Sequence, residues 1–515
     1  MNVLVTGGTG VVGTAAIPAL IRAGHTVRLL SRHADRDARS FPAGVEPFEA
    51  DVGRPETLDA ALQGCDAVLH IAGIVEEDPP EVTFEKVNVH GTRHLVDAAA
   101  AAGAPLFVHI SSLGADRGKS DYHQSKRQSE DIVRTYPGKW VILRPGNVYG
   151  PGDETLSTLL KMIRTLPAVP MVSFGDQAFQ PLWYADFGEV IVRVFERPEL
   201  AGSTLEVAGI ETTNTDEILR KLTEITGRQV PRMTIPVWLT EVGVQALEAF
   251  GSTGKRLLRS AGLGSPLNPA KLEMLLEENT LSESGHNALT DFVPNPTSLD
   301  DGLRMLADLL PEQLPGDGVG EVQQSTYWAE IKGSTYGAGE LLDLVCQRIQ
   351  DVMPIEFAAE PGVPRAAKEE GQTLTGAITG RGNIQVRLEE KTATRATFVT
   401  LEGHPLAGVM QLHAEDLPDA VRFNVHIASQ PANVIDWIAM KTIGGPMQRA
   451  NWRSVVRRVV SLSGGKAPDD VHQDSHPMGA QELRDLRAYA ERIVARQQRE
   501  IRAEQVSPEP DTARG

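Results

Sequence analysis

A glycine-rich turn near the start of the chain constrains the fold more than any other sequence feature. The run TGGTGVVG, residues 6–13, follows an apolar segment at 3–6 and leads into a stretch of helical periodicity at 11–23. Glycines spaced three apart between a strand and a helix allow a tight turn, close approach of a pyrophosphate and close strand–helix packing. The start of the helix presents free amides and a positive dipole end to phosphates. We therefore expect a dinucleotide to contact Gly7, Thr9, Gly10, Val11, Val12 and Gly13.

Strand-like and helix-like segments alternate from residue 2 to about residue 145. The apolar runs lie at 3–6, 27–30, 67–71, 106–110 and 140–143, and helical patterns lie between them at 11–23, 55–62, 82–102 and 122–136. Short apolar runs separated by amphipathic helices are typical of a parallel sheet that is covered on both faces. The pattern therefore predicts the α/β class, with a Rossmann doubly wound parallel sheet.

The end of the second predicted strand bears on the choice of cofactor. The strand at 27–30 is followed by Ser31 and Arg32, where an NAD-binding domain usually carries an acidic residue for the ribose hydroxyls. A guanidinium at this place can pair with a 2′-phosphate. The sequence therefore favours NADP, with NAD as the alternative. A solvated surface position for Arg32 is the competing interpretation.

Six motifs occur in a characteristic order along the first part of the chain. They are TGGTGVVG at 6–13, Asp51-Val52, HIAG at 70–73, NVHGT at 88–92, YHQSK at 122–126 and RPGNVYGPG at 144–152. In this order they resemble the extended short-chain dehydrogenase/reductases, a family that includes nucleotide-sugar epimerases and dehydratases. The resemblance covers roughly the first 310 residues. It implies a cofactor site that also contains Asp51 and Val52 near the adenine, Ala72 and Gly73 at the ribose and pyrophosphate, Asn88 behind the active-site helix, and Pro145, Asn147 and Val148 beside the nicotinamide.

The residues Tyr122 and Lys126 are four apart, so one helical turn places them on the same face. An unperturbed tyrosine has a pKa near 10, and a neighbouring ammonium lowers it. With Ser112, which alignment with the family favours over Ser111, the pair would bind a substrate oxygen and exchange its proton. The resemblance implies that Tyr122 and Lys126 also contact the cofactor. Nine residues separate Ser112 from Tyr122, fewer than in the sugar epimerases, so substrate contacts from this loop are in doubt.

The stretch 271–309 resembles the end of a branch that includes the accessory Rossmann subunit of respiratory complex I. In that branch the cofactor can be structural. Two functions therefore stay open. The first is an NADP-dependent oxidoreductase, epimerase or dehydratase that acts on an unknown carbonyl or hydroxyl compound. The alternative is a non-catalytic module that binds NADP(H) for structure or redox sensing.

A cluster of prolines and glycines at 311–320 predicts a linker between two domains. Beyond it, a helical pattern at 338–353 precedes alternating runs at 384–388, 409–412 and 421–427, and another helix at 447–462 follows. This order predicts an α+β domain at 321–480, and it resembles the helix-grip fold of START-type lipid-binding domains. The sequence leaves open whether this domain encloses an apolar pocket or has a fully packed core. Residues 481–515 are expected to form a helix, at 481–500, and a disordered tail.

Composition narrows the remaining function classes. The net charge of −18 argues against nucleic-acid binding, and two cysteines argue for a reducing, cytoplasmic location. No signal peptide or membrane-spanning run is evident. His472 and His476 have metal-like spacing, but they fall in a predicted loop without a third ligand, so no metal is expected. The expected partner is a small-molecule substrate, with an apolar compound as one option, and the oligomeric state stays open.

Overall fold

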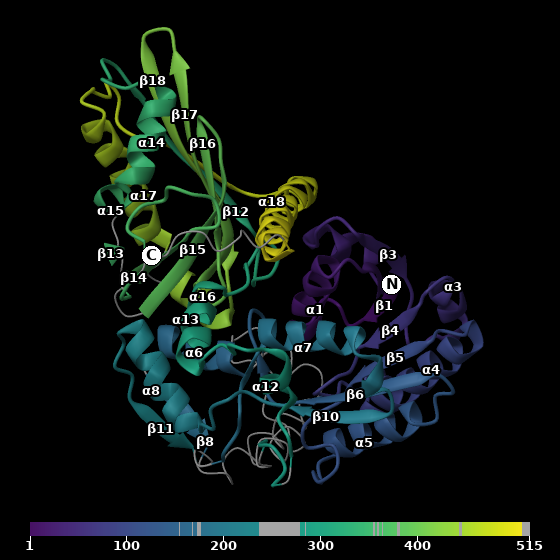
Figure 1. Cartoon of the computed structure of the whole chain (residues 1–515). Helices are drawn as coiled ribbons and strands as arrows, with labels where there is room; N and C mark the ends of the chain where they lie inside the picture. The colour runs from purple at the N-terminus through teal and green to yellow at the C-terminus, as the bar shows by residue number, and fades with distance from the viewer. Residues whose placement is uncertain are drawn as a thin grey trace, which may run out of the picture.

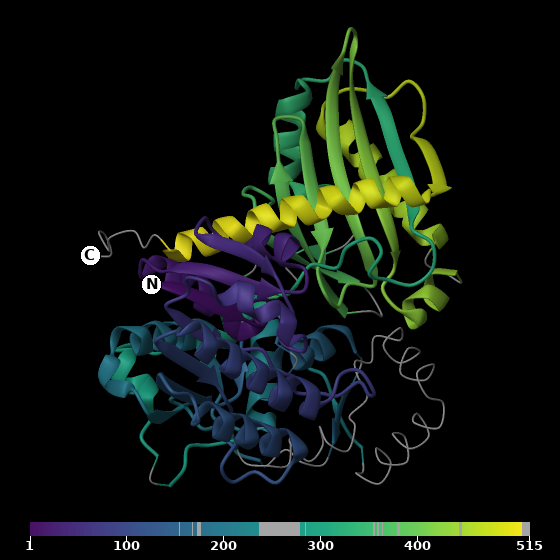
Figure 2. The same cartoon turned by 90° about the vertical axis from the view of Figure 1, so that its right-hand side faces the viewer.

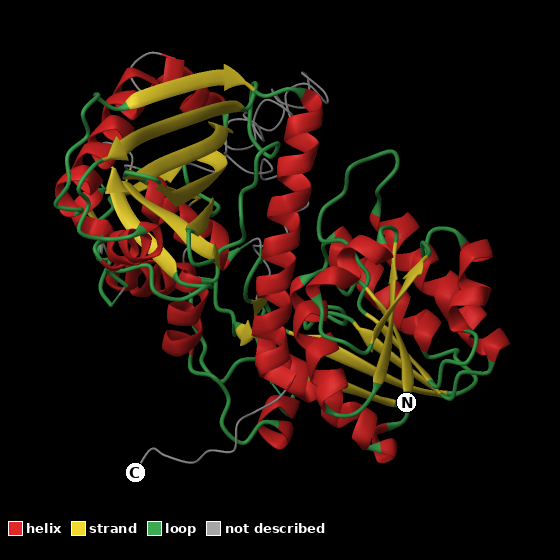
Figure 3. Cartoon of the chain, turned by 90° about the horizontal axis from the view of Figure 1, so that it is seen from above, coloured by secondary structure: helices red, strands yellow, loops and turns green. Residues whose placement is uncertain are grey.

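The computed structural model describes residues 1–153, 155–166, 168–172, 177–235, 279–283, 285–353, 356–357, 360–362, 364–378, 382–441 and 445–506. They form an α/β domain and an α+β domain, and a long C-terminal helix runs between the two (Figures 1 and 3). The sequence also predicts a helix at 238–250 and a disordered tail at 506–515, and both lie outside the described residues, apart from residue 506.

The first domain is built on a seven-stranded parallel sheet with the order β10-β6-β5-β4-β1-β2-β3. Its strands are β1 (Asn2–Thr6), β2 (Thr26–Ser31), β3 (Val45–Glu49), β4 (Ala67–His70), β5 (Leu106–Ile110), β6 (Lys139–Pro145) and β10 (Ser203–Val207). The chain runs outward from β1 to β3 and then crosses to the other side of β1, at β4. A crevice opens at such a switch point, beyond the carboxyl ends of the strands, and ligands of open α/β sheets bind there. The predicted doubly wound sheet is confirmed.

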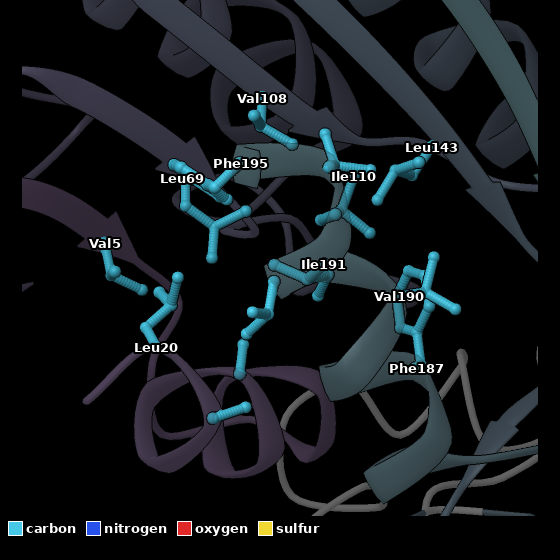
Figure 4. Packing of buried hydrophobic residues seen from close by; sticks show 14 of the residues in the cluster. Val5, Leu20, Leu69, Val108, Ile110, Leu143, Phe187, Val190, Ile191 and Phe195 are labelled. Atoms are coloured by element: carbon cyan, nitrogen blue, oxygen red, sulfur yellow. The ribbon is translucent and has the colours of Figure 1, made fainter. Parts of the chain in front are cut away.

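Helices cover both faces of this sheet because alternate strand residues point to opposite sides. On one face α1 (Val11–Arg22) and α7 (Tyr184–Glu196) pack against the sheet. Figure 4 shows this core, in which Val5, Leu69 and Val108 of the strands meet Leu20 of α1 and Ile191 of α7. On the other face the covering helices are α3 (Leu58–Leu62), α4 (Gly91–Ala102) and α5 (Asp121–Val133).

A smaller group of elements extends the first domain beyond the sheet. It contains α6 (Leu156–Thr165), α8 (Thr215–Thr226), α13 (Leu299–Asp308) and the parallel pair β8 (Val169–Val172) and β11 (Arg232–Ile235). Its core is built from Leu160, Leu222 and Leu303, which are fully buried. α13 ends at Asp308 and the next strand begins at Gln323, on either side of the predicted linker.

The second domain contains an eight-stranded antiparallel sheet with the order β13-β14-β15-β16-β17-β18-β12-β19. The strands are β12 (Gln323–Ile331), β13 (Glu356–Phe357), β14 (Thr373–Ile378), β15 (Gly382–Lys391), β16 (Arg395–Thr400), β17 (Leu406–Leu417), β18 (Ala420–Pro431) and β19 (His472–Pro477). On its inner face lie α14 (Ala338–Gln347), α15 (Ile349–Val352) and α17 (Gly445–Leu462), and α16 (Val434–Ala439) follows β18.

Two expectations for this domain need correction. The single helix expected at 338–353 is divided at Arg348 into α14 and α15. The loop expected around His472 and His476 is the edge strand β19, which pairs antiparallel with β12. All residues of β19 are exposed, so the strand has no buried face and lacks the alternation that indicates a strand in a sequence.

The helix α18 (Ala480–Val506) connects the two domains and is longer than the helix expected at 481–500. Its first half lies on the outer face of the second sheet, where Ala490 and Val494 pack against Val399 and Val409. Its second half crosses the first domain beside α1 and the short helix η1 (Ala38–Ser40) (Figure 2). No helix in the described part of the chain is both long and apolar enough to cross a membrane.

A buried ion pair joins the domains directly. Arg164 of α6 donates from Nε and Nη2 to the Glu360 carboxylate, at 2.8 and 2.6 Å, and from Nη1 to Gln385 Oε1 of β15, at 2.8 Å. Asn383 Nδ2 donates to Glu360 Oε1 as well. Both charged side chains are 2 % exposed. Since each charge is neutralised and hydrogen-bonded, this contact fixes how α6 sits on β15.

The carboxylate of Glu389 is also buried, but within the described part of the chain it lacks the hydrogen bonds that Glu360 receives. Glu389 of β15 is fully buried between the sheet and α18, and neither carboxylate oxygen has a hydrogen-bond partner among the described residues. Burial, and then the charge of Glu312, raises its pKa from 4.5 to about 8, against opposing effects of Arg387 and Arg496. Because the folded-state pKa lies above the unfolded value, stability falls as the pH rises through this interval.

We expect Glu389→Gln to stabilise the protein at pH 7 by on the order of 2–3 kcal/mol and to flatten the pH dependence of stability. The amide carries no charge that folding must neutralise. Chemical unfolding from about pH 5 to about pH 9 measures both effects. Glu369→Gln, at an exposed position, is the control and should change neither. Equal stability of Glu389→Gln and the parent across this range would contradict the assignment.

Candidate cofactor and active site

The glycine turn forms an open cradle at the switch point of the sheet. β1 ends at Thr6, and α1 begins after Gly10, where no side chain caps the helix. Gly7 has φ 69°, and a Cβ atom on it would lie 2.7 Å from Ala72 N; a Cβ on Gly13 would lie 2.4 Å from Gly8 Cα. Neither position therefore accepts a side chain. The uncapped amides of the first turn of α1 suit a pyrophosphate, so the residues present fit a dinucleotide.

The other wall of the cradle is held by His70, whose role the sequence did not indicate. Thr92 Oγ1 donates to Asn88 O at 2.6 Å, so it accepts from His70 Nε2 at 3.0 Å. Thr6 Oγ1 accepts from Ala72 N, at 3.2 Å, and donates to His70 Nδ1, at 2.8 Å. Both ring nitrogens are thus satisfied in the neutral form. Burial, and then the charge of Lys126, lowers the pKa of His70 to about 3, so the ring is neutral at neutral pH.

Asn88 connects the cradle to the helix that carries the tyrosine and lysine. It lies in a π-helical turn, Glu85–His90 (η3), before α4, a type of turn that is frequent at functional sites. Its side chain donates to Ser125 Oγ of α5, at 2.9 Å, and accepts from Ile74 N, at 2.8 Å. Ser129 Oγ, also on α5, donates to Asn88 O at 2.8 Å. The structure thus places Asn88 between α5 and the residues after Gly73.

Ser112, Tyr122 and Lys126 come together beside this wall. Lys126 is 5 % exposed and donates from Nζ to Ile110 O at 2.8 Å. A Cβ on Gly73 would lie 3.4 Å from Lys126 Nζ, so the lysine reaches the edge of the cradle. Tyr122, one helical turn earlier, hydrogen-bonds with Ser112, and its ring lies 6.0 Å from that of Phe84.

Burial governs the proton affinities of this group. It raises the pKa of the Tyr122 hydroxyl, and the hydrogen bond to Ser112 opposes the rise. Burial also lowers the pKa of the Lys126 ammonium to about 8, while the carboxylate of Glu130 acts in the opposite direction. Lys126 therefore stays mostly protonated at neutral pH. The lowered pKa expected for Tyr122 is therefore not found, because burial has the largest effect. The Tyr122 hydroxyl stays protonated at neutral pH and can donate its proton to a substrate oxygen held beside Ser112.

Glu130 is a positioning residue that the sequence interpretation missed. It is fully buried on α5 and accepts from Ser111 Oγ at 2.6 Å and from Arg144 Nε and Nη2, each at 2.7 Å. Burial alone would raise its pKa, but the hydrogen bonds from Arg144 and Ser111 hold the pKa below its ordinary value. Ser111 is thus turned toward Glu130, which leaves Ser112 to face Tyr122. The signal that could have indicated Glu130 is its spacing, since it follows Lys126 by four residues and therefore lies on the same helix face.

The remaining predicted residues lie around the same crevice. Arg32 is exposed just beyond β2 and makes no ion pair or hydrogen bond with a described residue. Asp51 follows β3, and its Oδ1 accepts from Gly53 N at 2.8 Å, while Val52 O accepts from His94 Nδ1 at 2.9 Å. Pro145 ends β6, Asn147 O accepts from Leu182 N, and Val148 begins the short strand β7 (Val148–Tyr149), which pairs with β9 (Leu182–Trp183).

A bound nicotinamide dinucleotide would supply hydride acceptance or donation at this site. The cradle of Gly7, Gly10 and Gly13 would hold its pyrophosphate, and Lys126 would reach its ribose from the edge marked by Gly73. Tyr122 and Ser112 lie where a carbonyl or hydroxyl oxygen can be bound and its proton exchanged.

Residues 3–208 match the family described as "NAD dependent epimerase/dehydratase family". The chain is similar to a protein named ceramide reductase from Caulobacter vibrioides, with 36 % identity over 172 residues, which are 33 % of this chain and 54 % of that protein. It is similar to sterol demethylase protein B from Methylococcus capsulatus, with 30 % identity over 257 residues, 46 % of this chain and 78 % of that protein.

A third similarity concerns the complex I branch. The chain is 30 % identical over 164 residues to the mitochondrial NADH dehydrogenase [ubiquinone] 1 alpha subcomplex subunit 9 of Mus musculus, across 32 % of this chain and 43 % of that subunit. The chain thus spans about half of the lengths of the ceramide reductase and of this subunit. All three similarities cover less than half of the present chain.

Proposed function

Because the chain belongs to the NAD dependent epimerase/dehydratase family, we propose that it is an NADP(H)-dependent oxidoreductase that acts on a hydroxyl or carbonyl group of an apolar small molecule. The observation that carries this proposal is the hydrogen-bonded pair of Ser112 and Tyr122, with Lys126 at the edge of a dinucleotide cradle. These three residues are the proposed catalytic groups. A buried lysine whose charge burial disfavours is typical of functional sites.

Two observations support an apolar substrate. Relatives of the chain include a ceramide reductase and a sterol demethylase protein B. Near the tyrosine, the ring of Phe84 faces Tyr122, and Val75, two residues beyond Gly73, is 40 % exposed. Apolar side chains around a few convergent polar groups are typical of sites for small hydrophobic molecules.

The test is oxidation of NADPH, followed by its absorbance, with a sterol ketone, a long-chain ketone and a UDP-sugar as separate substrates. We expect net NADPH consumption with an apolar ketone and none with the UDP-sugar. A 4-epimerase returns its hydride, so it would change the sugar without net consumption. Formation of an epimerised sugar would therefore overturn the proposed reaction while preserving the assigned site.

A second candidate function is a module that holds NADP(H) without turnover. The similarity to a subunit of the mitochondrial NADH dehydrogenase and the short connection between Ser112 and Tyr122 favour it. Tight binding of NADPH combined with no turnover of any substrate class would support this second function. Mass spectrometry of small molecules that copurify with the protein separates the two candidates further, because a copurified substrate or product would favour the enzyme.

For the second domain we propose a helix-grip fold of the START type, with a site for an apolar ligand between the sheet and α17. The support is the order of elements and the packing of Val455, Val456 and Val459 of α17 against the inner face of the sheet. Phe398 and Phe423 complete this buried cluster. The apolar pocket stays a prediction, and lipid extraction from the full chain followed by mass spectrometry tests it.

The proposed preference for NADPH gives a direct expectation for Arg32. We expect the protein to bind NADPH more tightly than NADH by about tenfold to about a hundredfold, and Arg32→Ala to remove most of the difference. The unpaired guanidinium is available to the 2′-phosphate, whereas Arg193 of α7 is exposed and already paired with Glu196 at 2.8 Å. Titration of each dinucleotide against the parent, Arg32→Ala and the control Arg193→Ala measures this. Equal affinities in the parent would rule the preference out.

A further inference from the structure

We infer that Arg502 of α18 is a positioning residue for the cofactor, which holds the segment after Arg32 and thereby sets the preference between NADPH and NADH. This inference rests on the proposed function and adds to it a residue far outside the matched residues 3–208. The segment concerned is residues 31–41, which leads from the end of β2 through η1 and is called the ribose segment below.

Arg502 binds the end of the ribose segment with three contacts. Its Nη1 donates to Ser40 O at 2.6 Å and to Ser40 Oγ at 2.7 Å. Its guanidinium carbon lies 4.5 Å from the centre of the Phe41 ring. Hydrogen bonds from a charged donor, together with stacking on an aromatic face, make this the kind of contact that an arginine forms and a lysine does not reproduce.

Hydrogen bonds inside the ribose segment carry this constraint toward Arg32. Ser40 Oγ donates to Asp37 O at 3.0 Å, and Asp37 Oδ2 accepts from Ser31 Oγ at 2.5 Å. Ser31 Oγ in turn accepts from His33 N at 3.2 Å. The residues on both sides of Arg32 are therefore tied, through Asp37 and Ser40, to the guanidinium of Arg502. The backbone that presents Arg32 is thus fixed before the cofactor arrives.

The turns of α18 just before Arg502 supply a support for this contact. Arg496 Nη2 donates to Glu370 Oε2 at 2.8 Å and to Glu389 O at 3.0 Å, and Gln498 Nε2 donates to Glu312 Oε2 at 3.1 Å. Arg496 and Arg502 are six positions apart, about 9 Å along the helix axis. The ribose segment is therefore attached to the second domain through a short, regular stretch of helix.

Pre-organisation of a binding segment increases affinity by lowering the ordering cost of binding. Without the Arg502 contact the ribose segment is less ordered, so binding must meet a larger ordering cost. The resulting loss of affinity falls mainly on NADPH, because its 2′-phosphate uses Arg32. We expect Arg502→Ala to weaken NADPH binding about tenfold and NADH binding by less than about threefold. The ratio of the two affinities therefore falls, which a purely structural role of α18 would not cause.

The experiment is titration of NADPH and NADH, by nucleotide fluorescence, into the full chain and into Arg502→Ala, Arg502→Lys, Ser40→Ala and Arg499→Ala. Arg499 is exposed on the same helix and is the matched control. We expect a reduced affinity ratio for both Arg502 variants, a smaller reduction for Ser40→Ala, which keeps the backbone acceptor, and no change for Arg499→Ala. Arg502→Lys retains the charge and keeps the test valid where the alanine variant folds poorly.

Two results would overturn the inference alone: an unchanged affinity ratio in both Arg502 variants, or an equal loss of NADPH and NADH affinity in them. Either result leaves the proposed function intact, provided that the parent binds a dinucleotide. A parent that binds neither dinucleotide would overturn the proposed function and this inference together. The parent titration thus separates the two failures.

Discussion

Replacement of Tyr122 by phenylalanine is expected to lower turnover by about 10²–10⁴-fold while the affinity for the cofactor stays nearly unchanged. The phenyl ring keeps the contact with Phe84 but removes the hydroxyl that bonds with Ser112 and exchanges the substrate proton. Cofactor contacts of Lys126 and the glycine turn do not depend on this hydroxyl. Steady-state NADPH oxidation with the best apolar ketone, together with cofactor titration, measures both effects.

Tyr136→Phe is the matched control for this prediction. Tyr136 follows the same helix, and its hydroxyl donates to Ala104 O in a buried position away from the crevice. Its loss should reduce stability but leave turnover per folded molecule unchanged. Turnover of Tyr122→Phe at the rate of the parent would remove the proposed catalytic role, whereas slow turnover in both variants would indicate a general disturbance of α5.

Removal of Arg164 is expected to cause the largest loss of stability among single changes at the domain contact. Arg164→Leu leaves the Glu360 carboxylate buried without a cation, and such an uncompensated charge costs about 3–5 kcal/mol. The double variant Arg164→Leu/Glu360→Leu should recover most of this loss, because both charges are then absent. Chemical unfolding, with proteolysis at the linker 311–320 as a second readout, measures the effect.

The same contact offers an exposed ion pair as a control. Lys161 of α6 donates to Glu402 Oε2 at 2.6 Å, and these side chains are 28 % and 38 % exposed. An ion pair in contact with water contributes less than about 1 kcal/mol, so Lys161→Ala should change stability little. Similar losses for Arg164→Leu and Lys161→Ala would show that burial of the first pair does not determine its effect.

Much of the first domain could be predicted from the sequence because its signals are local, but the two edge strands of its sheet, β3 and β10, were not identified. The glycine turn requires Gly7 and Gly13 within a few residues, and the strands are short apolar runs between amphipathic helices. In the second domain the runs in β15, β17 and β18 were visible, but β12, β13, β14, β16 and β19 were not identified. Part of the reason is that polar residues of the missed strands are buried by other elements: Thr373 of β14 against Asp308 of α13, and Thr397 of β16 against Tyr489 of α18. No sequence pattern reveals which polar strand face another domain will cover.

In the candidate site, too, the sequence revealed the local features and not the contacts between distant segments. The spacing of Tyr122 and Lys126 on one helix was readable, because one helical turn determines it. His70 was quoted within a motif, but its role depends on hydroxyls of Thr6 and Thr92, which come from β1 and α4. Arg502 is 462 residues from Ser40 in the sequence, and nothing near either residue indicates their contact.

That separation has a consequence for how the chain folds. Each domain core forms from contacts within its own part of the chain, whereas the contact of α18 with η1 closes a loop of 462 residues. Contacts of such long sequence separation carry the largest closure entropy and tend to form late. Opening of the C-terminal half of α18 would break its contacts with α1 and η1 but leave both cores folded. Such local opening costs less than global unfolding, and amide hydrogen exchange distinguishes the two.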